Sequence, residues 1–263
     1  MGPLLFLIYI DDVSSLELSE GSVLNLYADD MLLHKSVKCS EDYQQLQLDI
    51  DKISAWVDHN LLSLYPVKCK TMLLSRKWNL SQAPQFLLNE TPLEQVESFK
   101  YLGVLISLDL SWSAHIDSIC AKGKKLIGLL YRRFSSNLHS ERLLEMYKSL
   151  VRPHFEYAAP VWDPHLLKDI KSLENVQKYG LKMCLKKWDL GYQELLHLAQ
   201  LPTLENQRIY LKLCTLFKIT HGLFPFASDV FTPHPNRHHY NDLPLLCQPF
   251  ARTNSFQSSF VPI

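Results

Sequence analysis

The sequence lacks the excess of positive charge that usually marks a dedicated nucleic-acid-binding protein. Its 27 basic residues are balanced by 27 acidic residues, so the formal net charge is zero at neutral pH. Domains that bind nucleic acid on their own are usually basic, often along one face or one helix. The composition therefore argues mildly against autonomous nucleic-acid binding.

The six cysteines include no Cys-x-x-Cys pair. Their spacing predicts neither a zinc ribbon nor a compact disulfide framework. Isolated thiols of this kind are expected to be buried in a protein of a reducing compartment. A zinc site built from His234, His238, His239 and Cys247 is not favoured, because its spacing fits no common zinc motif.

No apolar run is long enough to cross a membrane. The apolar start of the chain ends at Asp11 and Asp12, well short of the roughly 20 residues that a spanning helix needs. It lacks the basic residues of a signal peptide, and Phe6 stands where a myristoylation motif has Ser or Thr. We therefore predict no membrane association and an intracellular location, in the nucleus or the cytoplasm. The segment itself predicts a core helix that begins at Pro3.

Hydrophobic residues make up 47% of the 263 residues, enough to bury a sizeable core in one large or two small domains. Apolar residues at helical spacing predict helices over residues 40–60, 111–133, 140–152, 165–184, 191–198 and 204–221. Strands are predicted at 70–74 and 99–106, with a loop and a short hairpin over 77–92, and 226–263 predicts an irregular tail. The predicted fold class is α/β followed by α.

Two adjacent acids interrupt an apolar stretch in residues 23–34. The first apolar run ends at Tyr27 and the second begins at Met31, with Asp29 and Asp30 between them. Two short apolar runs around a tight polar dipeptide predict a β-hairpin. An ordinary acidic turn is one interpretation. A metal site is the other, because Mg²⁺ is held by one or two carboxylates together with substrate phosphates.

The segment Tyr-Ala-Asp-Asp at residues 27–30 resembles motif C of reverse transcriptases. Residues 2–12 are similar to the end of motif B, and Lys-Cys at 68–69, Tyr-Leu-Gly-Val at 101–104 and Leu-Ser-Trp at 110–112 recur in the family's order. The resemblance is to reverse transcriptases of non-long-terminal-repeat (LINE-type) retrotransposons, and it extends from Gly2 to about Phe260.

This resemblance implies a fold and a reaction. Residues 1–108 are expected to form part of a right-hand polymerase palm, residues 109–225 a helical thumb- or connection-like region, and residues 226–263 a tail. The family copies RNA into DNA by nucleotidyl transfer with two Mg²⁺ ions. An RNA template, a DNA primer and a dNTP are the expected partners, and the oligomeric state is not predicted.

The resemblance also assigns roles near the acids. Asp29 and Asp30 are expected to be catalytic metal ligands, with Asp29 the better one. Lys68 matches the lysine of motif D, which neutralises or protonates the leaving pyrophosphate. A solvated lysine is the alternative. Tyr65 departs from the family pattern, which has Asn at this position.

Primer binding is expected at Tyr101, Leu102 and Gly103, the family's primer grip, although a plain strand bend at Gly103 is an alternative. A basic helical face follows and either contacts the nucleic-acid backbone or is simply solvated. It consists of Lys122, Lys124, Lys125, Arg132 and Arg133. The Trp and Tyr residues of 147–162 are expected in the core.

Motif A, which carries the opposing acid, precedes motif B in the family and is not present in the sequence. Asp11 and Asp12 are poor substitutes, because they fall at the end of the first predicted helix. We therefore expect a truncated polymerase that is inactive alone. The alternative is a non-enzymatic remnant that binds at most nucleic acid or a protein.

Overall fold

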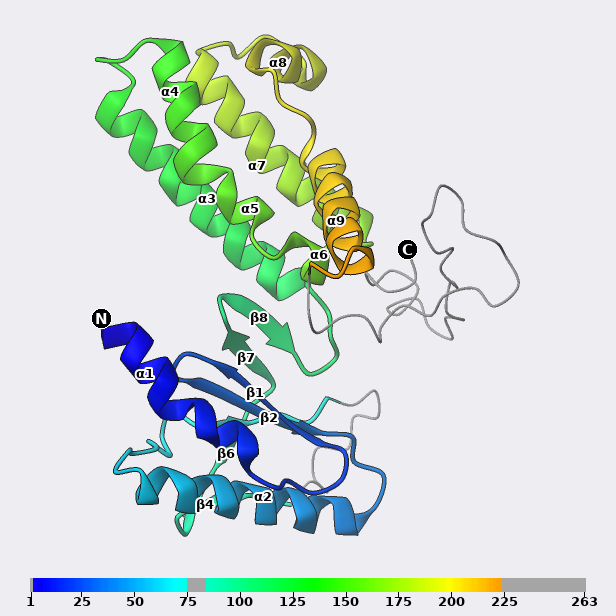
Figure 1. The fold of residues 1–263 in the computed structure, drawn as a ribbon. Helices are drawn as coiled ribbons and strands as arrows, with labels where there is room; N and C mark the ends of the chain where they lie inside the picture. The colour runs from blue at the N-terminus through cyan, green and yellow to red at the C-terminus, as the bar shows by residue number, and fades with distance from the viewer. Residues whose placement is uncertain (1, 75–83, 224–263) are drawn as a thin grey trace. The chain divides into compact units, whose positions relative to one another are not determined.

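The computed structural model of the protein describes residues 2–74 and 84–223. The chain divides into two compact units, Met1–Phe99 and Lys100–Ile263 (Figure 1). The predicted tail and the candidate zinc ligands lie outside the described residues. Among the helices of the described part, none is long and apolar enough to cross a membrane.

The first unit begins with the helices that its sequence predicts. Helix α1 spans Gly2–Ile10, the 3₁₀ segment η1 spans Asp11–Ser15, and α2 spans Ser40–His59. The predicted burial of α1 is wrong, because Leu4, Leu5 and Ile8 are each at least 60% exposed and only Ile10 is buried. An almost entirely apolar helix has no apolar stripe, so its sequence could not indicate which face would be covered.

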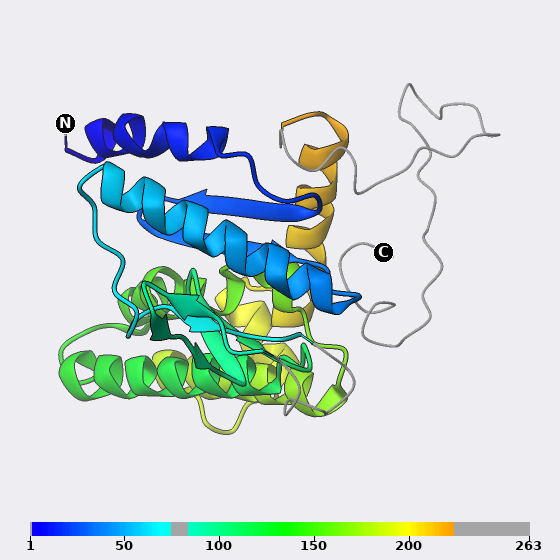
Figure 2. The ribbon, with the colours of Figure 1, turned by 90° about the horizontal axis from the view of Figure 1, so that it is seen from below.

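A hairpin of β1 (Ser22–Tyr27) and β2 (Asp30–Lys35) is the longest strand pair of the first unit. Burial alternates along both strands, so one face is half-covered and the other is exposed. Helix α2 contacts β2 and runs along the hairpin (Figure 2). The hairpin therefore packs on α2, and one face of the hairpin is exposed to solvent.

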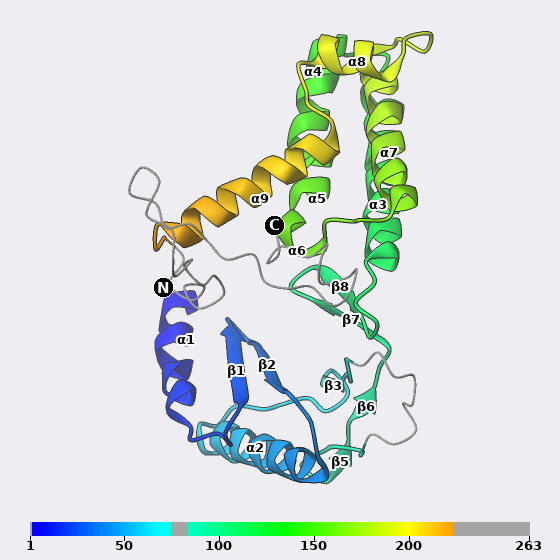
Figure 3. The same ribbon diagram turned by 90° about the vertical axis from the view of Figure 1, so that its right-hand side faces the viewer.

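The remaining strands of this unit are two residues long. Strand β3 (Lys70–Thr71) pairs in parallel with β6 (Glu94–Gln95), and β4 (Leu87–Leu88) forms a short hairpin with β5 (Thr91–Pro92). The predicted strand at 70–74 is thus shorter than expected. Throughout the described residues the strands form separate two-stranded sheets (Figure 3).

The second unit begins with a hairpin and continues as helices. Strand β7 (Ser98–Tyr101), within which the boundary between the units falls, pairs with β8 (Val104–Ser107). The hairpin lies at the N-terminal end of α3 (Figure 1). The helical elements, which confirm the prediction of a helical second part, are α3 (Ser113–Phe134), α4 (Ser140–Met146), the π-helical η3 (Tyr147–Val151), α5 (Pro153–Glu156), α6 (Ala159–Trp162), α7 (Leu167–Leu185), α8 (Tyr192–Ala199) and α9 (Leu204–Thr220).

The core of the second unit forms where α3 packs along α7 and the shorter helices cover them (Figure 1). Tyr147, Phe155 and Trp162 are fully buried there, as expected for this aromatic segment. The same expectation is wrong for Tyr157, whose side chain is 58% exposed. Tyr157 ends the short helix α5 with a ψ of 125°, and its neighbour Ala158, which precedes α6, has a positive φ of 53°, so the chain turns at this point.

Candidate functional site

The two aspartates lie at the tip of the β1–β2 hairpin, which confirms the predicted position. Tyr27 pairs with Asp30 across the strands, so Ala28 and Asp29 form a two-residue turn. Ala28 has a positive φ of 52°. This conformation costs an L-residue about 1–2 kcal/mol and is tolerated where the surrounding structure holds it. Both carboxylates are exposed.

Helix α2 fixes the base of this hairpin. The fully buried carboxylate of Asp49 accepts hydrogen bonds from the Ser19 amide and the Ser19 hydroxyl, both at 2.9 Å. From the other strand, the Lys35 ammonium donates to the Glu20 carbonyl at 2.7 Å and to Gln45 Oε1 at 2.6 Å. The segment before β1 and the end of β2 are therefore held on one helix, and the tip projects from a fixed base.

The pair at the tip offers free oxygen ligands. Neither the Asp29 nor the Asp30 side chain forms a hydrogen bond or ion pair within the described residues. Exposed carboxylate oxygens suit a hard cation such as Mg²⁺, which takes its remaining ligands from water and substrate phosphates. In the described part of the chain, no group of three or more His, Cys, Asp or Glu is placed to hold a metal. The tip therefore fits part of a coordination shell.

Lys68 lies in a turn just before β3. Its backbone amide donates to the Tyr65 carbonyl at 2.9 Å, and its ammonium lies 5.4 Å from the centroid of the Tyr65 ring. A cation at this distance from an aromatic face is attracted to it. Tyr65, the residue that departs from the family pattern, therefore sits beside the lysine. Lys68 remains exposed and available to an anion.

The segment around Gly103 forms a hairpin turn and not a simple strand bend. Strand β7 ends at Tyr101 and β8 begins at Val104, so Leu102 and Gly103 form a two-residue connection. Both have positive φ, 45° and 86°. Tyr157, which was predicted to lie in the core, donates a hydrogen bond from its hydroxyl to the Leu102 carbonyl at 2.8 Å.

The five basic residues of α3 are all exposed, and none forms an ion pair within the part of the chain that the structure describes. Helical periodicity places four of them, Lys122, Lys125, Arg132 and Arg133, on one stripe, hereafter the basic stripe. Lys124 lies roughly 80° around the helix from the edge of this stripe. The predicted basic face therefore holds four residues and not five.

Comparison with known proteins shows which family the N-terminal part of the chain is similar to. The family of reverse transcriptases (RNA-dependent DNA polymerases) matches residues 1–106. Residues 1–106 are thus similar to reverse transcriptases. The matched segment contains the β1–β2 hairpin, Lys68 and the β7–β8 turn. No solved structure matches the chain.

Similar proteins come from Drosophila mobile elements. The probable RNA-directed DNA polymerase from transposon X-element of Drosophila melanogaster is 26% identical over 184 residues, which cover 66% of this chain and 20% of that protein. The RNA-directed DNA polymerase from mobile element jockey of Drosophila funebris is 28% identical over 172 residues, 62% of this chain and 18% of that protein. The chain thus spans about a fifth of the length of these relatives. The predicted resemblance to LINE-type reverse transcriptases is confirmed.

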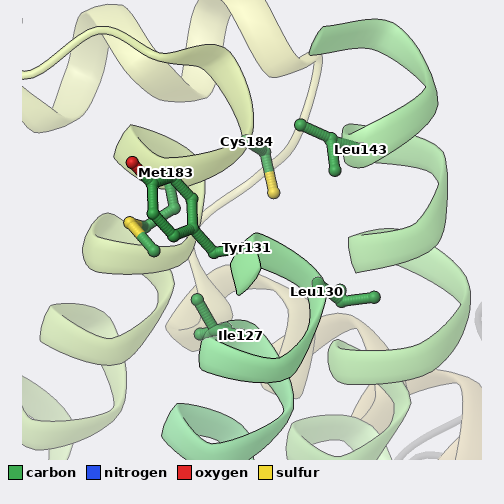
Figure 4. A pocket seen from close by; sticks show the side chains of 6 residues that line it. All are labelled: Ile127, Leu130, Tyr131, Leu143, Met183 and Cys184. Carbon is green, nitrogen blue, oxygen red and sulfur yellow. The ribbon is translucent and has the colours of Figure 1, made fainter. Parts of the chain in front are cut away.

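The helical unit that follows the reverse transcriptase segment contains a small apolar cavity between α3, α4 and α7 (Figure 4). Cys184 lines it, and burial raises the pKa of this thiol to about 12. Burial likewise raises the pKa of Cys120 to about 11. Both thiols are therefore protonated packing groups, as predicted for isolated cysteines. Cys39 is exposed, and Cys69 and Cys214 are only partly buried, so these three depart from that prediction.

Proposed function

We propose that this chain supplies the paired aspartates of an RNA-directed DNA polymerase. One observation carries the proposal: Asp29 and Asp30 stand free and exposed at a hairpin tip within the segment that matches the reverse transcriptase family. In this proposal the first unit is part of the palm, and the helices of 109–225 form a thumb-like region. RNA template, DNA primer and dNTP are the substrates.

The hairpin-tip residues and Lys68 have different roles in this proposal. Asp29, with Asp30 beside it, would hold Mg²⁺, and the ion would supply charge neutralisation at the transferring phosphoryl group and activation of the primer hydroxyl. The small side chain of Ala28 leaves room for a substrate backbone at the turn. The exposed ammonium of Lys68 neutralises or protonates the leaving pyrophosphate.

We propose further that the 263-residue chain does not polymerise alone. Two adjacent residues of one turn reach the reacting phosphate from one side, whereas a two-ion site needs ligands from a neighbouring strand as well. Misplacing a reacting group by about 1 Å already costs roughly 100-fold in rate. An ion held by this turn alone is therefore poorly placed to activate the primer.

A non-enzymatic nucleic-acid-binding protein is the second candidate. The observation that favours it is the basic stripe of α3, whose four side chains are exposed and unpaired among the described residues. Such a protein binds phosphates without using the aspartates. The two candidates thus differ in whether Asp29 matters when metal and nucleic acid are both present.

Binding of Mn²⁺, followed by electron paramagnetic resonance, tests the proposal. The purified chain is mixed with an RNA template, a shorter annealed DNA primer and a dNTP, and free Mn²⁺ is titrated. Asp29→Asn should weaken Mn²⁺ binding by about tenfold or more, because a charged ligand is lost.

Asp11→Asn combined with Asp12→Asn is the matched control, because these acids are also adjacent and exposed but lie in η1. This double variant should bind Mn²⁺ like the wild type. Unchanged Mn²⁺ binding in Asp29→Asn, with nucleic-acid binding retained, would favour the non-enzymatic candidate.

A further inference from the structure

The turn between β7 and β8 contains Leu102 in a left-handed backbone conformation that leucine does not favour. Leu102 and Gly103 both have positive φ, as in a type I′ turn. Such turns prefer Asn-Gly or Asp-Gly, because Asn and Asp tolerate the left-handed region. Leucine lacks that tolerance, so its conformation must be supported by contacts from elsewhere in the fold.

Tyr157 supplies this support from 55 positions further along the chain. Its hydroxyl donates to the Leu102 carbonyl at 2.8 Å. Its ring lies over the next residue, because a Cβ added to Gly103 would be 3.3 Å from Tyr157 Cε1. The polar end and the ring of one side chain thus contact both residues of the turn.

Tyr157 is in turn held by buried aromatic residues that lead back to the hairpin. Its carbonyl accepts a hydrogen bond from Trp162 Nε1 at 2.8 Å, and the buried Trp162 ring meets the His115 ring edge-to-face at 5.3 Å. Nδ1 of His115 accepts the Leu105 amide of β8 at 3.2 Å. These contacts close a circuit that joins the turn and strand β8 to α3 and α6.

The exposure of Tyr157 separates it from its partners in this circuit. Trp162 and His115 are buried and contribute to the core, whereas Tyr157 is more than half exposed and covers little apolar surface. The hydroxyl of Tyr157 contacts Leu102, and its ring lies beside Gly103. We therefore infer that the main role of the Tyr157 side chain is to hold Leu102 and Gly103 in the turn conformation.

We propose that Tyr157 is a positioning residue that presents the β7–β8 turn to the 3′ end of a primer. The inference rests on the proposed function, in which Tyr101, Leu102 and Gly103 bind the primer. Tyr157 itself acts through the turn: its hydroxyl fixes the Leu102 carbonyl, and its ring limits the path of the backbone at Gly103.

Tyr157→Phe in the full chain tests the proposal, because it keeps the ring and removes the hydroxyl. The first readout is hydrogen–deuterium exchange of the backbone amides of residues 101–105. We expect about three- to tenfold faster exchange there, the effect of losing one hydrogen bond, and unchanged exchange in α7. Adding Leu102→Asn should restore slow exchange, because Asn-Gly forms this turn without outside support.

The second readout is binding to two RNA–DNA probes of equal length and charge pattern, one with a recessed primer end and one blunt. Tyr157→Phe should reduce the preference for the recessed end by about three- to tenfold and leave blunt-duplex binding unchanged, while the melting temperature falls by no more than about 4 °C. Tyr210→Phe, which removes a similarly exposed hydroxyl from α9, should change neither readout.

The outcomes separate this inference from the proposed function. Wild-type preference for the recessed end, with Tyr157→Phe unchanged in exchange and in binding, would overturn the positioning role and leave the proposed function standing. Equal binding of both probes by the wild type would instead overturn primer binding at this turn, and the positioning role with it, even if exchange responds to Tyr157→Phe.

Discussion

Single residues in unfavourable backbone conformations stand at two hairpin turns that carry candidate functional residues. Ala28 and Leu102 each have positive φ at the first position of a two-residue turn. The acids beside Ala28 were predictable, because a polar pair between apolar runs is a local signal. The support of Leu102 by Tyr157 could not be predicted from the sequence, because no local pattern links residues 55 positions apart.

His115 should make stability depend on pH. Burial, and then the charge of Lys100, lowers the pKa of His115 below its ordinary value of 6.5. The unfolded chain therefore takes up the proton at a higher pH than the folded chain. The stability is fully present above pH 6.5 and should fall as the pH drops from there toward the folded pKa.

Thermal melting at about pH 7.5 and about pH 5.5 measures this effect. His115→Asn is the comparison, because the Asn Oδ1 replaces Nδ1 as acceptor of the Leu105 amide but does not titrate. The variant should lose less stability on acidification than the wild type. An equal loss in both proteins would show that His115 is not the responsible group.

At the scale of elements, the sequence predicted helices better than strands. Regular apolar spacing located α2, α7 and α9 to within one or two residues, because helical contacts are local. The two-residue strands β3 and β6 depend on partners more than 20 positions away, and a short apolar run does not identify them. The exposure of α1 was unpredictable for a similar reason: burial is set by what packs against a helix.

Close packing of α3 against α5 gives a test at this scale. A Cβ on Gly123 would lie 2.3 Å from Cζ of the fully buried Phe155. Gly123→Ala should therefore lower the free energy of unfolding by about 1–3 kcal/mol, measured by urea denaturation.

Gly128→Ala in the same helix is the matched control. Its Cβ would meet only the mobile end of Arg132, at 3.2 Å. Higher helix propensity should then leave the protein unchanged or raise its stability by up to about 1 kcal/mol. A Gly123→Ala variant as stable as Gly128→Ala would mean that Phe155 moves aside at no cost.

At the scale of the whole molecule, a net charge of zero conceals a local concentration of positive charge on α3. Composition could not reveal this, because acidic residues elsewhere balance the basic stripe. Helical periodicity combined with exposure does reveal it. A neutral protein with one basic stripe should bind nucleic acid weakly, without sequence preference and with strong dependence on salt.

Replacing the basic stripe tests this expectation. The variant has alanine at Lys122, Lys125, Arg132 and Arg133, and its binding to an RNA–DNA duplex is measured between about 50 and 200 mM salt. Binding should be weaker than that of the wild type. The slope of log affinity against log salt should fall by roughly 3, because up to four phosphate contacts are lost. A control variant with alanine at the exposed Lys148, Lys168, Lys171 and Lys187 should keep most of the slope. Equal slopes in the two variants would contradict a localised binding surface.

Primer extension on an RNA template tests whether Asp29 and Asp30 form the metal-binding part of a nucleotidyl-transfer site that this chain does not complete alone. With Mg²⁺ or Mn²⁺, the purified chain and its Asp29→Ala variant should both leave the primer unextended, while an intact reverse transcriptase extends it. Extension by the wild-type chain that disappears in Asp29→Ala would show instead that the chain contains a complete site.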